Sequence, residues 1–282
     1  MNQPLQDALV QTAEDVCALP LVRRLAAMLD RDPMALREGD RLPHGWHVTL
    51  FNAPTAQSQL RPDGAASLGV TMPDIGLPRL MMGGRQLRYL QDIPIGAHVR
   101  RETRQGEVQV KQGRSGRFAL VTVEHRIFVQ GRDTPSVVEN IDYVLRAAGG
   151  SASAAPTAAA PVTATRQEPT PDAVRAVLPD EALLFRYSAI TDNPHRIHYD
   201  RPYATGGEGY PALVVNGSIP TMFLLEMFRS SAGREPSTFT SRNVAPMFCG
   251  HPLKLCVRKE HSSWRLWAQD EHGQISFDAR AQ

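Results

Sequence analysis

One segment of the 282-residue chain concentrates the side chains that proton transfer requires. Residues 187–200 read Tyr-Ser-Ala-Ile-Thr-Asp-Asn-Pro-His-Arg-Ile-His-Tyr-Asp and hold two imidazoles, carboxylates, a carboxamide and a guanidinium. A histidine titrates near neutrality, so its neutral imidazole can take a proton from water and later return one. His198 is the candidate base, although the spacing alone leaves a solvated turn with two ordinary histidines equally open.

This segment is predicted to be a loop between rigid elements. Residues 192–194 (Asp-Asn-Pro) break any helix, and Asp200, placed before Arg201 and Pro202, can cap a new one. Polar loop residues that a rigid scaffold holds in place are where catalytic groups tend to lie. The segment is therefore a reasonable place for an active site.

The first half of the chain is predicted to combine helix and strands. Residues 6–29 have a largely three- and four-residue apolar spacing, which favours a helix that Pro20 splits in two. The glycines of residues 113–116 predict a hairpin turn. Strands are predicted at residues 45–50, 107–131 and 136–145.

A linker is predicted at residues 147–172, which contain Ala, Gly, Ser, Pro and Thr with almost no large apolar side chain. The expected units are an N-terminal domain at residues 1–146 and a C-terminal domain at residues 173–282.

In the second half, residues 182–190 fit either a strand or a short helix. Residues 217–229 predict a helix with Pro220 in its first turn. Strands are predicted at residues 246–257, 263–268 and 274–279, with a turn at 270–273. Two α+β units of similar make-up suggest a duplication.

Composition excludes several classes of protein. The net charge is +2 and no Lys/Arg run could follow a phosphate backbone, so nucleic acid is not an expected partner. No apolar stretch approaches the roughly 20 residues that span a bilayer, and the first residues lack a secretory signal. The three cysteines, Cys17, Cys249 and Cys256, lack disulfide or zinc spacing, and Cys249 with His251 has no matching pair of ligands. We expect a cytoplasmic protein without a metal.

The segment around His198 resembles the signature of the MaoC-like hydratases. Within that family it is most similar to the branch of hydroxyacyl-thioester dehydratase type 2 and mesaconyl-C4-CoA hydratase. The resemblance is carried by Thr191, Asn193 and residues 195–200, then by residues 201–205, 208–211 and 213–217. In the first half it rests on residues 45–47 (Gly-Trp-His), 82–85 (Met-Gly-Gly-Arg) and 111–116.

The resemblance implies a double hot-dog: two fused domains, each an antiparallel sheet wrapped on a central helix. It also implies an acyl-CoA hydratase with one site, in the second domain, and no cofactor. The expected substrate is itaconyl-CoA or mesaconyl-C4-CoA, hydrated to citramalyl-CoA. A homo-oligomer is possible.

Hydration beside a thioester needs a base and a donor for the enolate-like oxygen. The resemblance makes His198 the base, but Asn193 stands where the broader family has an acidic residue, and a carboxamide cannot remove a proton. Either His198 acts alone, which we favour, or Asp192 replaces the missing carboxylate. The oxyanion donor would be a backbone N–H at the start of the helix at Gly217. The candidates for a substrate carboxylate or the CoA phosphates are Arg85, Arg196 and Arg201.

Two other functions remain open. The same residues would serve a 3-hydroxyacyl-thioester dehydratase of fatty-acid synthesis, and Asn193 is compatible with a non-catalytic acyl-CoA-binding hot-dog protein. The sequence has no Walker loop, dinucleotide glycine fingerprint or Gly-x-Ser-x-Gly elbow.

Overall fold

The computed structural model of the protein describes residues 10–52, 55–65, 72–113, 116–147 and 170–282. Most of the predicted linker, residues 147–172, therefore lies outside the described residues. Among the described residues, none of the helices is both long enough and apolar enough to cross a membrane.

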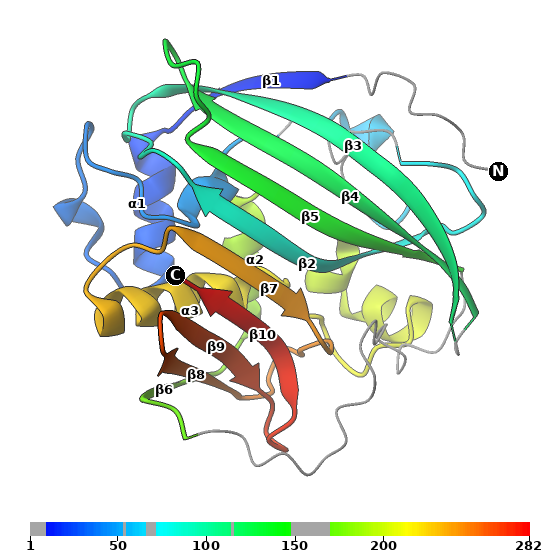
Figure 1. Cartoon of the computed structure of the whole chain (residues 1–282). Coiled ribbons are helices and arrows are strands. Elements are labelled where there is room, and N and C mark those ends of the chain that lie inside the picture. Colours follow the sequence, from blue (N-terminus) through cyan, green and yellow to red (C-terminus); the bar gives the residue numbers. More distant parts are fainter. Residues whose placement is uncertain (1–9, 53–54, 66–71, 114–115, 148–169) are drawn as a thin grey trace.

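In the described ranges, ten antiparallel strands form one curved sheet, shown in Figure 1. The first half contributes β1 (Gln11–Val16), α1 (Leu19–Met28), β2 (Arg79–Tyr89), β3 (His98–Gly113), β4 (Gly116–Val129) and β5 (Val137–Arg146). The second half contributes β6 (Ala173–Val177), α2 (Glu181–Ile190), α3 (Ile219–Ala232), β7 (Thr238–Asn243), β8 (Leu253–Glu260), β9 (Ser263–Gln269) and β10 (Ile275–Ala281).

The two halves repeat one topology. The strand order is β1-β3-β4-β5-β2 in the first half and β6-β8-β9-β10-β7 in the second, so each strand of one half has a counterpart in the other. The equivalent strands β2 and β7 pair antiparallel, from Gly84 opposite Arg242 to Arg88 opposite Thr238. This arrangement supports the predicted duplication, because two copies joined through equivalent strands are related as the halves of a twofold dimer.

A glycine permits the close approach at the β2–β7 junction. A Cβ atom at Gly84 would lie 2.4 Å from the carbonyl oxygen of Ser241, which is closer than two such atoms can approach. The absence of a Cβ atom at Gly84 thus lets β2 and β7 pair closely, so that the two halves share one continuous sheet.

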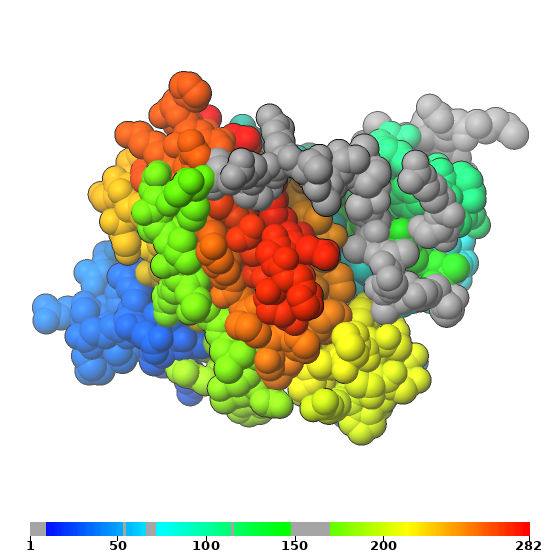
Figure 2. Space-filling view, turned by 90° about the horizontal axis from the view of Figure 1, so that it is seen from below, coloured from blue at the N-terminus to red at the C-terminus, as the bar shows by residue number. Residues whose placement is uncertain are grey.

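The core of the second half is built on α3, which carries Pro220 in its first turn as predicted. Most of its side chains are buried, among them Met222, Leu224 and Phe228. The helix contacts β8 and β9 and ends at Gly233 in the left-handed conformation. Figure 2 shows this half from below, with β6 in green beside the orange and red strands and the yellow segment near residues 200–210 as a lobe at one side.

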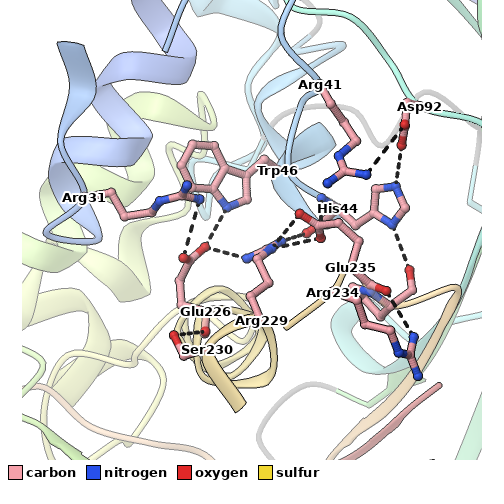
Figure 3. Close-up of polar contacts among 11 residues, drawn as sticks. Arg31, Arg41, His44, Trp46, Asp92, Glu226, Arg229, Ser230, Arg234 and Glu235 are labelled. Atoms are coloured by element: carbon pink, nitrogen blue, oxygen red, sulfur yellow. Dashed lines mark hydrogen bonds and ion pairs between the residues drawn. The ribbon is translucent and has the colours of Figure 1, made fainter. Parts of the chain in front are cut away.

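A partly buried polar cluster ties α3 to the first half (Figure 3). Glu226 accepts a hydrogen bond from Trp46 Nε1 at 3.2 Å, and Arg229 donates to the carbonyl oxygen of His44. Arg229 also binds Glu226 and Glu235, at 2.5 and 2.9 Å. Trp46 is fully buried. These contacts therefore hold the segment around Trp46 in the first half against α3, the central helix of the second half.

Three local predictions were wrong. Residues 11–16 form the strand β1, not a helix, because they pair with β3. The helix therefore begins only at Leu19, and Pro20 lies in its first turn instead of splitting it. Residues 45–50 contain a short 3₁₀ helix, Trp46–Thr49, because Gly45 adopts a left-handed φ of 92° that ends extended structure. The strand predicted from residue 246 begins only at Leu253.

The other element predictions agree with the structure in type, with α2 resolving the ambiguity at residues 182–190 as helix. The hairpin at residues 113–116 fits the pairing of Gly113 with Gly116, although residues 114–115 lie outside the described part. Three strands were missed: β2, β6 and β7.

Candidate active site

His198 lies at the end of the short 3₁₀ helix Arg196–His198 and is 7% exposed. Its Nδ1 atom is 2.7 Å from the carbonyl oxygen of Val214. A carbonyl can only accept, so Nδ1 carries the ring proton and Nε2 keeps its lone pair. The backbone N–H of Val214 in turn donates to the carbonyl of Ile197 at 2.9 Å, which ties the two segments together and fixes the ring.

The environment keeps His198 neutral. Burial lowers the pKa of its imidazole to about 4, against the opposing effect of the hydrogen bond to Val214, and His195 lowers the pKa further. The ring of His195 lies edge-on at 5.6 Å between centroids. A neutral imidazole with one free nitrogen is the form that a general base needs at neutral pH.

His198 lines a cavity of about 740 Å³ that both halves enclose. The second half contributes the segments around His198 and Gly217, and the first half contributes residues of β2 to β5. At one end the wall includes Arg61, Pro62 and Pro78, which are exposed, whereas Arg85, His125 and Glu139 are buried. The cavity therefore runs from an exposed rim to a buried polar end.

Asn193 and Asp192 both lie on the cavity wall. The Oδ1 atom of Asn193 accepts a hydrogen bond from the backbone of His195 at 3.2 Å, which leaves the amide NH₂ to orient a water molecule. The backbone at Asp192 is not extended, because its φ is 45° in the left-handed region, so side chains do not simply alternate between two faces at this point of the loop. Asp192 is exposed, which distinguishes it from the buried His198.

Gly217 lies on the wall two residues before α3. Among the described residues its backbone N–H has no hydrogen-bond partner, whereas the next N–H, of Ser218, donates to Asn216 Oδ1 at 3.2 Å. A Cβ atom at Gly217 would lie 3.1 Å from Asn243 Nδ2 and 3.2 Å from Met82 Cε. A free amide at this position can stabilise a developing oxyanion.

Two predicted arginines are not part of the cavity wall. The guanidinium of Arg196 binds Asp200 at 2.8 Å and stacks on Tyr203 at 4.1 Å, so it stabilises the loop that carries His198. Arg201 is exposed on the surface and does not line the cavity.

Arg85 does line the cavity, but its guanidinium has partners within the protein. Nη2 donates to Ser218 Oγ at 2.7 Å, and Nη1 lies 3.3 Å from Glu139 Oε1. Arg85 thereby connects β2 with β5 and with the start of α3.

Four polar residues at the buried end of the cavity were not predicted from the sequence. His47, Arg101, His125 and Glu139 all line the cavity. A signal for two of them was present, because His125 and Glu139 occupy inward positions in strands whose other inward side chains are apolar. Polar residues at core positions of an alternating strand often mark function.

Glu139 is ionised in this setting. Burial works to raise the pKa of its carboxyl, but the charge of Arg85 and the nearby His47 outweigh burial and hold the pKa far below its usual range. His47 Nε2 lies 3.5 Å from Glu139 Oε2. Burial also lowers the pKa of His125 to about 4, so this ring is neutral while it shares a 2.9 Å hydrogen bond with Thr103.

Comparison with known proteins agrees with this geometry. The family model for hydroxyacyl-thioester dehydratase type 2 matches residues 45–249. The mesaconyl-C4-CoA hydratase of Chloroflexus aurantiacus is 36% identical over 95% of this chain and 93% of its own. The chain belongs to the hydroxyacyl-thioester dehydratase type 2 family, and it is an enzyme of the hydro-lyase class.

Solved structures agree on the fold. A MaoC-like dehydratase from Phytophthora capsici has a TM-score of 0.70 at 13% identity and covers 97% of this chain and 94% of its own. A Mycobacterium tuberculosis protein described as a double hotdog fold has a TM-score of 0.62 at 14% identity and covers 98% and 96%. The predicted α+β double hot-dog is confirmed.

Proposed function

We propose that this protein hydrates a short branched C5 dicarboxylyl-CoA, mesaconyl-C4-CoA or its isomer itaconyl-CoA, to citramalyl-CoA. The observation that carries the hydratase chemistry is the buried His198, whose proton-bearing nitrogen is fixed on Val214 while the other nitrogen stays free. The choice of substrate is supported by the identity to a mesaconyl-C4-CoA hydratase over most of both chains.

The exposed rim and the buried end of the cavity suggest how the substrate enters. The CoA portion is large and hydrophilic, so it would remain at the rim near Arg61 and Pro78, which are exposed. The acyl group would extend past His198 towards the buried polar end. In this orientation the reacting double bond is shielded from bulk water.

Each proton is accounted for in the reaction. Nε2 of His198 takes a proton from a water molecule that Asn193 orients, and the oxygen forms a bond to the β-carbon of the conjugated thioester. The electrons of the double bond move to the thioester oxygen, where the Gly217 N–H donates a hydrogen bond. When the carbonyl re-forms, His198 returns the proton to the α-carbon.

Itaconyl-CoA requires one earlier step, because its double bond is not conjugated with the thioester. His198 would remove a proton from the carbon next to the thioester carbonyl, and that enolate would take up a proton at the terminal methylene carbon. The product is the conjugated mesaconyl-C4 isomer, which is then hydrated. The same base and the same oxyanion donor serve both steps.

The family match keeps a second activity open, the dehydration of 3-hydroxyacyl thioesters in fatty-acid synthesis, which is the reverse reaction on a different acyl group. Mass spectrometry of the products from a panel of enoyl-CoA esters separates the alternatives. Hydrated C5 diacid esters support the proposal, and hydration of straight-chain esters alone supports the dehydratase. Binding without any product supports a non-catalytic protein.

We further propose the domain boundaries 1–146, 147–172 and 173–282. In their support, β5 ends at Arg146 and β6 begins at Ala173. A cytoplasmic location and a homo-oligomer remain predictions, which cell fractionation and light scattering would test.

A further inference from the structure

The buried end of the cavity is a row of polar side chains on one face of the first-half sheet. The strand pairing places Thr103 opposite His125 and His125 opposite Glu139. Arg101 is two residues before Thr103 on β3, and Arg85 lies opposite Ile141, two residues after Glu139 on β5. Residues two apart on a strand share a face, so Arg101, His125, Glu139 and Arg85 all project to the same side.

The charges in this row do not balance within the protein. Arg85 and Glu139 form one ion pair. Among the residues that the structure describes, no carboxylate lies within ion-pair distance of Arg101, whose guanidinium instead stacks on Phe51 at 4.9 Å. The row therefore holds one positive charge more than negative, with His125 neutral.

Removing a guanidinium partly from water costs free energy unless an anion forms an ion pair with it. Within the described part of the chain, the Nε atom of Arg101 is buried without a hydrogen-bond partner. The Nε2 atom of His47 is also buried without a hydrogen bond there, although it faces Glu139 Oε2 at 3.5 Å. These atoms line the cavity that also holds His198, so a ligand anion in that cavity could pair with them. A single carboxylate would bring the row to neutrality.

We propose that Arg101 is the residue that binds the free carboxylate of the substrate, with His125 beside it, and that it thereby selects a CoA ester of a dicarboxylic acid. This inference rests on the proposed function, because it names the substrate class of the same site. Arg85, which the sequence suggested for this role, is held by Glu139 and Ser218 and would shape the pocket. A planar guanidinium suits a carboxylate because it can donate two parallel hydrogen bonds.

A binding experiment with unreactive esters tests this role apart from catalysis. Succinyl-CoA carries a free carboxylate, and butyryl-CoA is the matched ester without one. Isothermal titration calorimetry should show that the wild type prefers succinyl-CoA, and that Arg101→Met reduces this preference about 10- to 100-fold, the range expected for a charge-assisted hydrogen bond. Arg101→Lys, which keeps the charge, should restore part of the preference.

Arg100→Met is the matched control. Arg100 is the neighbour of Arg101 on β3 but points to the other face, where it pairs with Glu102 and stacks on Phe128 at 4.5 Å. This variant should keep the wild-type preference. Thermal melting of all three variants would show whether each is folded.

A kinetic experiment on the same proteins measures the ratio of kcat/KM for mesaconyl-C4-CoA to kcat/KM for crotonyl-CoA. The ratio should fall at least about tenfold in Arg101→Met and stay level in Arg100→Met. An equal loss for both esters, or an equal affinity of the wild type for succinyl-CoA and butyryl-CoA, would overturn the role of Arg101. If the wild type shows the Arg101-dependent preference but hydrates no ester, the carboxylate site stands and the proposed function fails.

Discussion

The Nδ1 atom of His198 lies 2.7 Å from the carbonyl oxygen of Val214. The ring proton is therefore fixed on Nδ1, and Nε2 keeps the lone pair that can accept a proton. Burial lowers the pKa of this imidazole from 6.5 to about 4. His198 can act as a base only when its imidazole is unprotonated. The activity is therefore lost as the pH falls through the pKa of this imidazole. Protonation would also disturb this ring, because none of the carboxylates in the described residues forms an ion pair with His198 that could stabilise its charge.

We expect kcat/KM to stay level from pH 8 down to about pH 5 and to fall as the pH approaches 4, since kcat/KM reports the groups of the free enzyme. Circular dichroism at each pH, with activity measured again after return to pH 7, controls for acid unfolding. If kcat/KM of the folded protein instead falls near pH 6.5, the site does not lower the pKa of its base.

Asn193 is expected to orient water through its amide, because its Oδ1 atom is already engaged by the backbone of His195. Asn193→Ala should lower kcat at least about tenfold, since a misplaced nucleophile loses the advantage of orientation. Asn193→Asp should retain or raise the activity, because a carboxylate can both orient water and take its proton. Steady-state kinetics of the three proteins tests this, and equal activity of all of them would remove Asn193 from the site.

Gly217→Ala should lower kcat about 10- to 100-fold, in keeping with the displacement of an oxyanion donor. The added methyl group would lie 3.1 Å from Asn243 and 3.2 Å from Met82, so the backbone must shift. Gly206→Ala is the control, because a Cβ atom there meets no atom within 4 Å. If both alanine variants are as active as the wild type, the Gly217 amide is not the donor.

The two halves should stay together after the chain is cut in the predicted linker. A protease site inserted near Ala158 would leave β2 paired with β7, and the cluster of Trp46, Glu226 and Arg229 intact. Size-exclusion chromatography should show one peak that contains both fragments. Elution as two separate folded fragments would contradict the fused-dimer arrangement.

The sequence predicted the part of the site that is contiguous in the chain. Asn193 and His198 lie five residues apart in one loop, within the contiguous block of residues that resembles the family signature. Arg101, His125 and Glu139 come from three different strands, and only the pairing register brings them onto one face. No local pattern contains that register, which is why the buried end of the cavity was not predicted.

The fold errors have the same physical origin. Residues 11–16 have a spacing that fits a helix, yet their partner in β3 lies more than 80 positions later in the chain, from His98 to Thr103. Long-range pairing overrides local preference. By contrast, a helix was predicted at residues 217–229 and α3 spans Ile219–Ala232, because Pro220 and the apolar sequence are local signals.

The most direct test of the account is the loss of the base. Wild type and His198→Ala are compared on mesaconyl-C4-CoA by the decrease in enoyl-thioester absorbance, with circular dichroism to confirm that the variant is folded. We predict that the folded variant hydrates the ester at least about a hundredfold more slowly, the usual scale for the loss of a general base. A folded His198→Ala protein with turnover close to the wild type would contradict the assignment of His198 as the base.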